Sequence, residues 1–408
     1  MSEWGSHRLS EVADLCLGKM LDQKKNKGEL RPYLGNLNVR WGTIELDDLK
    51  EMRFEDRELD RYGLRNGDIV MCEGGEPGRC ALWTGQAPTM MIQKALHRIR
   101  PFESVDSQFL FYALFHKGRA GGFDAYFTGA TIKHLPGEQL AKIEVQLPPT
   151  ETQRRIAGIL GAYDDLIEVN RRRVAVLEDM ARGLFEEWFV RLRFPGHESV
   201  PLHNTPDGPL PEGWRWGAFG DLVTELRVSV QPADIEPDAV YLGLEHLPRR
   251  STTLADKGAA GDVSSMKLRF QRGDILFGKI RPYFHKVVWA PFDGVCSSDA
   301  IVWRPVARHQ AQALAIASSD VFVNHSVQTS NGTKMPRANP KVLSQFKCAM
   351  APAVLSDQFE RLCLPLVEAA AAYQAANQRL TASRDLLLPR LMSGGLSVAE
   401  AQKELEIA

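Results

Sequence analysis

The sequence predicts an α+β protein with two tandem, similar domains, each followed by a long helix. One observation is an internal repeat that covers nearly the whole chain; the other is a heptad pattern of apolar residues after each copy. If the two helices pair as an antiparallel coiled coil, the molecule gains a pseudo-twofold axis. The expected segments are a first domain, a central helix, a linker with the second domain, and a C-terminal helix with a tail, at 1–149, 150–192, 193–353 and 354–408.

The two copies of the repeat match at ordered positions. The matched pairs, in chain order, are Trp4 with Trp214, Tyr33-Leu34-Gly35 with Tyr241-Leu242-Gly243, Leu64 to Val70 with Phe270 to Leu276, Arg100-Pro101 with Arg304-Pro305, and Leu140 to Pro149 with Leu343 to Pro352. The offset falls steadily from 210 to 203 along the chain. A duplicated domain with a few small deletions explains this order.

Each copy has the pattern of a mixed α+β domain. Gly67-Asp68 and Gly273-Asp274 indicate tight turns that lead into apolar strands at 69–71 and 275–277. Residues 107–116 and 310–318 show the apolar spacing of short helices.

Apolar residues alternate at spacings of three and four after each copy, which predicts two long helices with a packed seam. The central seam is Ile156, Leu160, Tyr163, Ile167, Asn170, Val174, Leu177, Ala181, Leu184 and Trp188. The C-terminal seam is Phe359, Leu362, Leu366, Ala369, Tyr373, Ala376, Leu380, Ser383 and Leu387. Asn170 is either a buried amide that fixes the register of the helices or a solvated position, and the pattern alone leaves both open.

The central helix is too long to pack on one domain. About 40 residues at ~1.5 Å per residue give about 60 Å. We therefore expect it to pair with the C-terminal helix and to act as a spacer between the domains.

Charge and cysteine content narrow the function classes. The net charge of −1 gives no whole-chain sign of a nucleic-acid partner, but residues 321–350 carry four basic residues and no carboxylate. The six cysteines lack zinc-ligand spacing, so we expect buried free thiols and no metal site. Without a signal peptide or an 18-residue apolar run, a cytoplasmic protein that does not contact membranes is expected.

We find no catalytic constellation in the sequence. The motifs of serine hydrolases, zinc proteases, kinases and adenine methyltransferases do not occur. Gly273 to Lys279 approaches a phosphate-binding loop, but Ile280 replaces the Ser or Thr that would hold Mg²⁺. A non-catalytic chain without its own cofactor is expected.

With this organisation, the chain resembles the specificity subunits of type I restriction–modification enzymes. The likeness lies in Leu210 to Trp214, in Pro148-Pro149 followed by Glu151 to Ala157, in Asp164 to Asn170, and in Leu388 to Gly394. The resemblance implies two target-recognition domains that each bind one half of a bipartite sequence in double-stranded DNA. It also implies two methyltransferase (modification) subunits that bind S-adenosylmethionine and methylate adenine N6. Restriction subunits, where the system has them, would use ATP and Mg.

Loops that differ between the copies are the candidates for base contacts. Glu73 to Arg79 in the first copy corresponds to Lys279 to His285 in the second. Arg and Lys can bind guanine or phosphate, and Glu can accept from cytosine. The candidate DNA-binding residues are Arg79, Gln93, Lys94, Lys133, His134, Lys279, Arg281, Ser297, Ser298, Lys334, Arg337 and Asn339. Solvated turns and plain strand faces are the alternative interpretation.

Two rival functions remain at this point. One is a coiled-coil scaffold whose duplicated domains bind proteins, which the near-neutral charge favours. The other is an enzyme with an unfamiliar site.

Overall fold

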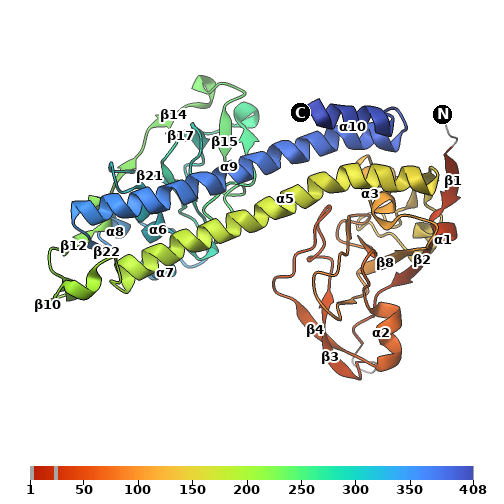
Figure 1. The fold of residues 1–408 in the computed structure, drawn as a ribbon, viewed down its shortest axis with the longest axis horizontal. Helices are drawn as coiled ribbons and strands as arrows, with labels where there is room; N and C mark the ends of the chain where they lie inside the picture. Colours follow the sequence, from red (N-terminus) through yellow and green to blue (C-terminus); the bar gives the residue numbers. More distant parts are fainter. Residues whose placement is uncertain (1–3, 23–25, 408) are drawn as a thin grey trace. The chain divides into compact units, whose positions relative to one another are not determined.

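The computed structural model describes residues 4–22 and 26–407 and divides into two compact units (Figure 1). One unit comprises Met1–Asp165 with Ala382–Ala408, and the other comprises Leu166–Thr381. Both divisions fall inside the long helices and not at the domain ends expected from the sequence. Each unit thus contains one sheet-bearing domain and a segment of each long helix. The predicted α+β class with a long helix after each domain is confirmed.

The internal repeat is visible as two matching four-stranded sheets. The strand order is β2 (Ala13–Leu17), β8 (Leu96–Pro101), β5 (Ile69–Cys72) and β6 (Cys80–Leu82) in the first unit, and β13 (Val223–Leu226), β21 (Ala300–Pro305), β18 (Ile275–Gly278) and β19 (Val287–Trp289) in the second. All neighbours in both sheets are antiparallel. The strands predicted at 69–71 and 275–277 are therefore confirmed, and both are inner strands.

The remaining strands form smaller sheets. The first unit has β4 (Lys50–Phe54), β3 (Glu29–Leu34) and β7 (Met91–Ile92) in one sheet, and β1 (Gly5–Arg8) beside β9 (Glu144–Leu147). The second unit has β14 (Ser229–Val230), β17 (Lys267–Phe270), β20 (Gly294–Cys296), β15 (Val240–Leu242) and β16 (Gly258–Ala259) in one sheet, β12 (Arg215–Ala218) beside β22 (Lys347–Met350), and the hairpin of β10 (Leu202–Thr205) and β11 (Gly208–Pro211).

Short helices complete each domain. They are α1 (Leu9–Val12), α2 (Asp56–Tyr62), α3 (Ser107–Arg119) and α4 (Gly137–Leu140) in the first unit, and α6 (Gln310–Ala317), α7 (Asp320–Gln328) and α8 (Pro340–Leu343) in the second. The helices predicted near 107–116 and 310–318 are confirmed as α3 and α6.

The same buried ion pair supports the central sheet in both units. Asp68 is 1% exposed and accepts two hydrogen bonds from Arg100, both at 2.7 Å. Asp274 is also 1% exposed and accepts from Arg304 at 2.8 and 2.9 Å. Each carboxylate also accepts a backbone N–H from the turn before its strand. The Gly-Asp and Arg-Pro dipeptides that match between the two copies thus contribute the ion pair that stabilises each sheet.

Two long helices pass through both units. Helix α5 (Thr150–Phe185) continues into a π-helical turn at Glu186–Val190, and α9 (Ala353–Met392) is followed by α10 (Val398–Ile407). In the second unit Phe359 of α9 packs on Trp188 and Phe189, with ring centroids 5.8 and 4.9 Å away. In the first unit the C-terminal residues of α9 and Ala401 of α10 join the domain core.

Phe359 and Leu387 are buried as the pattern placed them, but between them the buried face of α9 lies about one residue after the predicted seam. Leu362 is 51% exposed, whereas the neighbouring Cys363 is 1% exposed. Leu366, Tyr373 and Leu380 are only partly buried. The buried residues of α9 in the second unit are Ser356, Phe359, Glu360, Cys363, Val367, Ala370, Ala371 and Asn377. The pattern favoured the large apolar residues, but small side chains line the contact. Leu387 is buried in the first unit.

The central seam lies largely where the pattern placed it. Ile156, Leu160, Ile167, Val174 and Trp188 are at most 7% exposed, and Tyr163, Leu177, Ala181 and Leu184 are partly buried. Asn170 is 4% exposed and donates to Oδ1 of Asn377, itself 5% exposed, at 3.0 Å. Asn377 Nδ2 in turn donates to the Ile167 carbonyl at 3.3 Å. Asn170 is therefore the buried amide, and its partner is a residue that the predicted seam missed.

The amide pair predicts a specific stability pattern. Replacing Asn377 with Leu leaves the Asn170 Nδ2 group without its acceptor in an apolar seam, and we expect a loss of about 1–3 kcal/mol. The double variant Asn170→Leu, Asn377→Leu should regain that stability, but it should no longer fix the register of the two helices. Hydrogen exchange of residues 166–181 measures both effects. A double variant less stable than the single one would contradict this account.

Two further properties hold for the described residues. None of their helices is long and apolar enough to cross a membrane. All six cysteines are buried and unpaired, and burial raises the pKa of Cys296 to about 12, so this thiol stays protonated.

Candidate nucleic-acid interface

Three loops of the second unit meet in a hydrogen-bonded cluster that we call the three-loop junction. It consists of residues 279–285, 297–299 and 331–339. The backbone N–H of Lys279 donates to the Asp299 carbonyl at 2.8 Å, and the Lys279 carbonyl accepts from Ala338 at 2.9 Å. The N–H of Arg281 donates to the Pro336 carbonyl at 2.8 Å. These bonds place segments that are far apart in sequence side by side.

The first unit builds the same junction from residues 73–79, 93–95 and 128–135. The N–H of Glu73 donates to the Ala95 carbonyl at 2.8 Å, and the Glu73 carbonyl accepts from Leu135 at 2.8 Å. These three residues correspond to Lys279, Asp299 and Ala338 with the offsets of the internal repeat. The duplicated scaffold therefore presents an acidic residue in one unit where the other presents a lysine.

The second junction is rich in cations. Arg281 has a left-handed backbone with φ 49, and its Nε is buried without a hydrogen-bond partner among the described residues. Lys334 and Arg337 are exposed, and Arg337 lies 3.6 Å from the Asp299 carboxylate. Lys279 is partly buried. A strained arginine beside exposed cations suits contact with an anionic partner.

The first junction holds its charges differently. Arg79 is 11% exposed, and its guanidinium donates to the Asn36 carbonyl and the Glu76 carboxylate, both at 2.7 Å. Arg79 therefore stabilises the loop from its buried side. His134 Nδ1 lies 3.3 Å from the Glu73 carboxylate. Lys94 and Lys133 are both exposed, and Lys133 Nζ lies 5.6 Å from the centroid of the Phe127 ring.

The remaining candidates serve local turns. Gln93 Oε1 accepts from the Ala95 N–H at 3.0 Å, and Ser297 Oγ accepts from the Asp299 N–H at 3.2 Å. Asn339 caps α8 by accepting from Lys341 at 3.0 Å. That oxygen is no longer free to pair bidentately with adenine. Ser298 is exposed.

Sequence reasoning missed two residues of this region. Asp299 lies 3.6 Å from Arg337 and carries the carbonyl that holds Lys279. Arg249 places its guanidinium 4.2 Å from the centroid of the Phe284 ring. The signal for both was the same: each is a charged residue where the other copy has an uncharged one, namely Ala95 and Trp41.

The comparisons with known proteins agree with this duplicated arrangement. Residues 1–179 match the family model described as type I restriction modification DNA specificity domain. The MjaIX specificity subunit of Methanocaldococcus jannaschii is 24% identical over 98% of this chain and 94% of its own length. The chain is therefore similar to type I restriction–modification specificity subunits over nearly its whole length.

Other relatives are similar to this chain over shorter stretches. The Escherichia coli EcoDI specificity subunit is 25% identical over 63% of this chain and 61% of its own length. The MjaVIII subunit of M. jannaschii is 30% identical over 52% and 47%, respectively. A crystal structure of a type I S subunit from M. genitalium has a TM-score of 0.58 at 14% identity and covers 96% of each chain, which shows a shared fold.

Proposed function

We propose that this specificity subunit binds a bipartite, asymmetric target in double-stranded DNA and positions two adenine methyltransferase subunits on it. The observation that carries the proposal is the pair of three-loop junctions. Glu73 and Lys279 make matching backbone hydrogen bonds but carry opposite charges. Equivalent scaffolds with different loop chemistry suit two half-sites of different sequence.

The role of the subunit in this proposal is non-catalytic, as in its family. S-adenosylmethionine would be bound by the methyltransferase subunits, and ATP with Mg by any restriction subunit. The gap between the half-sites would follow the length of the α5 spacer helix.

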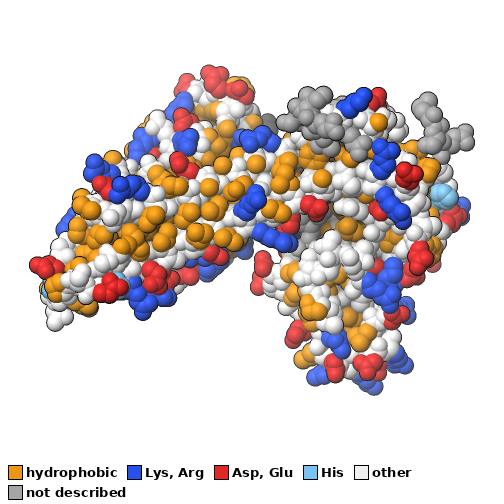
Figure 2. Space-filling view, in the orientation of Figure 1, with side chains coloured by type: hydrophobic (Ala, Val, Ile, Leu, Met, Phe, Trp, Pro, Cys, Tyr) orange, Lys and Arg blue, Asp and Glu red, His pale blue; other side chains and the backbone are white. Residues whose placement is uncertain are grey.

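An exposed apolar stripe on α5 supports docking of a partner subunit. Leu166, Val169, Val176 and Met180 are between 42% and 57% exposed and recur at helical spacing on one face. Figure 2 shows hydrophobic side chains along the helices of the second unit. Surface of this kind usually marks a protein contact, and we assign it to a methyltransferase subunit.

Sequencing of modified adenines tests the function directly. Cells that carry this subunit with its methyltransferase partner should show N6-methyladenine in one bipartite, asymmetric motif. A purified complex should also bind duplex DNA in a salt-sensitive way. Methylation without a motif, or no salt-sensitive binding, would favour the protein-binding scaffold instead.

Two substitutions separate base contacts from phosphate contacts at the second junction. Arg281→Ala should relax one base position of one half-site by about 1–3 kcal/mol, because a guanidinium can bind guanine O6 and N7 bidentately. Arg337→Ala should weaken binding to all duplexes and lower the salt slope by about one unit. Competition binding with single-base variants of the target distinguishes the outcomes. Uniform weakening by Arg281→Ala would assign this arginine to phosphate.

A further inference from the structure

A fourth loop extends the second junction toward the spacer helix. This loop, residues 249–253, contacts the 279–285 loop through the backbone N–H of Arg250, which donates to the His285 carbonyl at 2.9 Å. Arg249 lies over Phe284, whose own N–H donates to the Arg281 carbonyl at 2.9 Å. The candidate base-contacting loop and Arg249 are therefore joined by direct contacts.

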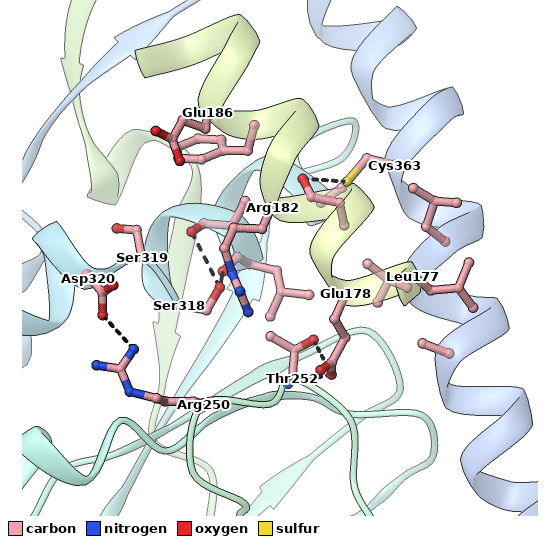
Figure 3. Close-up of a pocket in the computed structure, with 18 of the residues that line it drawn as sticks. Leu177, Glu178, Arg182, Glu186, Arg250, Thr252, Ser318, Ser319, Asp320 and Cys363 are labelled. Carbon is pink, nitrogen blue, oxygen red and sulfur yellow. Dashed lines mark hydrogen bonds and ion pairs between the residues drawn. The ribbon is translucent and has the colours of Figure 1, made fainter. Parts of the chain in front are cut away.

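Glu178 of α5 clamps this fourth loop. Its Oε1 accepts from the backbone N–H groups of Thr252 and Thr253 at 2.8 and 3.1 Å. It also accepts from three hydroxyls, those of Ser251, Thr252 and Thr253, at 2.8, 3.1 and 3.0 Å. Figure 3 shows Glu178 reaching from the helix to Thr252 beside a cavity of about 300 Å³. Hydrogen bonds to a charged acceptor are the stronger kind, so the loop is fixed to the helix.

The other side of the loop is fixed as well. Arg250 forms an ion pair with Asp320 at 3.0 Å (Figure 3). His285 Nε2 donates to the Ser318 carbonyl at 2.7 Å, and burial lowers the pKa of this ring. Arg250 and His285 both have left-handed backbones, with φ 58 and 53. Strained residues persist only where their surroundings hold them, and they cluster at binding sites.

Arg249 is the free cation of this clamped loop. It is exposed, and no described carboxylate pairs with it, in contrast to Arg250. With the offset of 208 that relates Tyr33 to Tyr241, its counterpart in the first unit is Trp41. The Trp41 indole N–H donates to Glu76 at 2.7 Å. Of these two matched positions, only the one in the second unit carries a cation, and the neighbouring Arg40 of the first unit is paired with Glu45.

We propose that Arg249 binds a DNA phosphate beside the second half-site and that Glu178 is a positioning residue that holds its loop there. This inference rests on the proposed DNA-binding function and adds a contact that the comparison of loops 73–79 and 279–285 did not identify. A guanidinium seated on an aromatic ring and anchored by its loop loses little conformational freedom when it binds phosphate.

Salt-dependent binding tests the phosphate contact. The subunit with its two methyltransferase partners is titrated onto its duplex target between 50 and 200 mM salt. Arg249→Ala should reduce the slope of log affinity against log salt by about 0.9. The ratio of wild-type affinity to variant affinity should then be about 3.5 times larger at 50 mM than at 200 mM salt. The matched control is Arg308→Ala, which also removes one exposed arginine, here paired with Asp357 at 3.3 Å, and should leave the slope unchanged.

Arg249→Lys should keep the slope. An unchanged slope in Arg249→Ala, or a loss confined to one base pair of the target, would overturn the phosphate contact. If the wild-type complex shows no salt-sensitive duplex binding, the proposed function itself fails. If the wild-type complex binds duplex DNA in a salt-sensitive way but Arg249→Ala leaves the salt slope unchanged, only the present inference fails.

A double-variant comparison tests the role of Glu178. Glu178→Ala should reproduce the reduced salt slope of Arg249→Ala, and the double variant should be no worse than either single one. Glu178→Gln, which still accepts hydrogen bonds, should restore most of the slope. If the two single variants instead reduced binding affinity independently, so that their effects multiplied in the double variant, Glu178 would not act by positioning Arg249. If Glu178→Ala unfolds the second unit, Glu178→Asp, whose carboxylate is one methylene shorter and reaches the loop less well, replaces it in the same comparison.

Discussion

Arg100→Met is expected to destabilise the first unit by about 3 kcal/mol, one of the two largest effects that we predict. The substitution leaves the Asp68 carboxylate, which is 1% exposed, with a backbone N–H of the preceding turn as its hydrogen-bond donor. Removal of one partner of a buried ion pair typically costs 3–5 kcal/mol. Arg100 is 21% exposed, so water can approach the carboxylate, and we place the loss at the lower end.

The duplicated pair provides the control for this prediction. Arg304→Met breaks the equivalent bond to Asp274 in the second unit, but Arg304 is 42% exposed, so its removal should cost less than that of Arg100. Hydrogen exchange resolved by peptide separates the two units. Protection should fall around β5 and β8 for Arg100→Met, and around β18 and β21 for Arg304→Met. Equal losses in both units after one substitution would contradict an ion pair that acts within its own unit.

A second variant tests whether the unpaired charge is the cause. Asp68→Asn combined with Arg100→Met removes the carboxylate charge and keeps an acceptor for the backbone of the turn. We expect this double variant to regain part of the protection lost in Arg100→Met. A double variant as unstable as the single one would assign the loss to packing of the arginine stem.

The internal repeat made much of the fold predictable. Because Asp68 and Asp274 stand at matching positions, as do Arg100 and Arg304, the sequence showed that each unit would use the same scaffold. It did not show that these residues meet. The partners are 32 and 30 residues apart in the chain, and only the order of strands in the sheet brings them together.

The candidate site was less predictable because its contacts are long-range. Comparison of the copies located the loops that carry Lys279 and Arg337. It could not show that Arg79 is held by Asn36, 43 residues away, or that Asn339 caps a helix. Arg249 stayed hidden because its environment depends on Glu178, a residue of the spacer helix that has no role in the heptad pattern.

The seam of α9 was missed for a different reason, which is side-chain size. A heptad pattern weights large apolar residues, and around 369–372 four consecutive alanines leave the rotation of the helix undetermined. The buried face is set by small residues and by Asn377, which pairs with Asn170. A shift of one residue turns the helix by about 100°, enough to move Leu362 into solvent.

Phe359→Ala against Leu362→Ala decides that register experimentally. Phe359 is fully buried and contacts the rings of Trp188 and Phe189, so truncation should destabilise the second unit by about 3–5 kcal/mol. Leu362 is 51% exposed, and its truncation should change stability by less than about 0.5 kcal/mol. Both substitutions place the same residue on the same helix, three positions apart, so helix propensity nearly cancels. Hydrogen exchange of residues 181–190 and 353–367 measures the difference. Equal losses of stability from the two substitutions would support the seam predicted from the large apolar residues. A loss from Phe359→Ala alone would support the buried face that contains Cys363, Ala370 and Asn377.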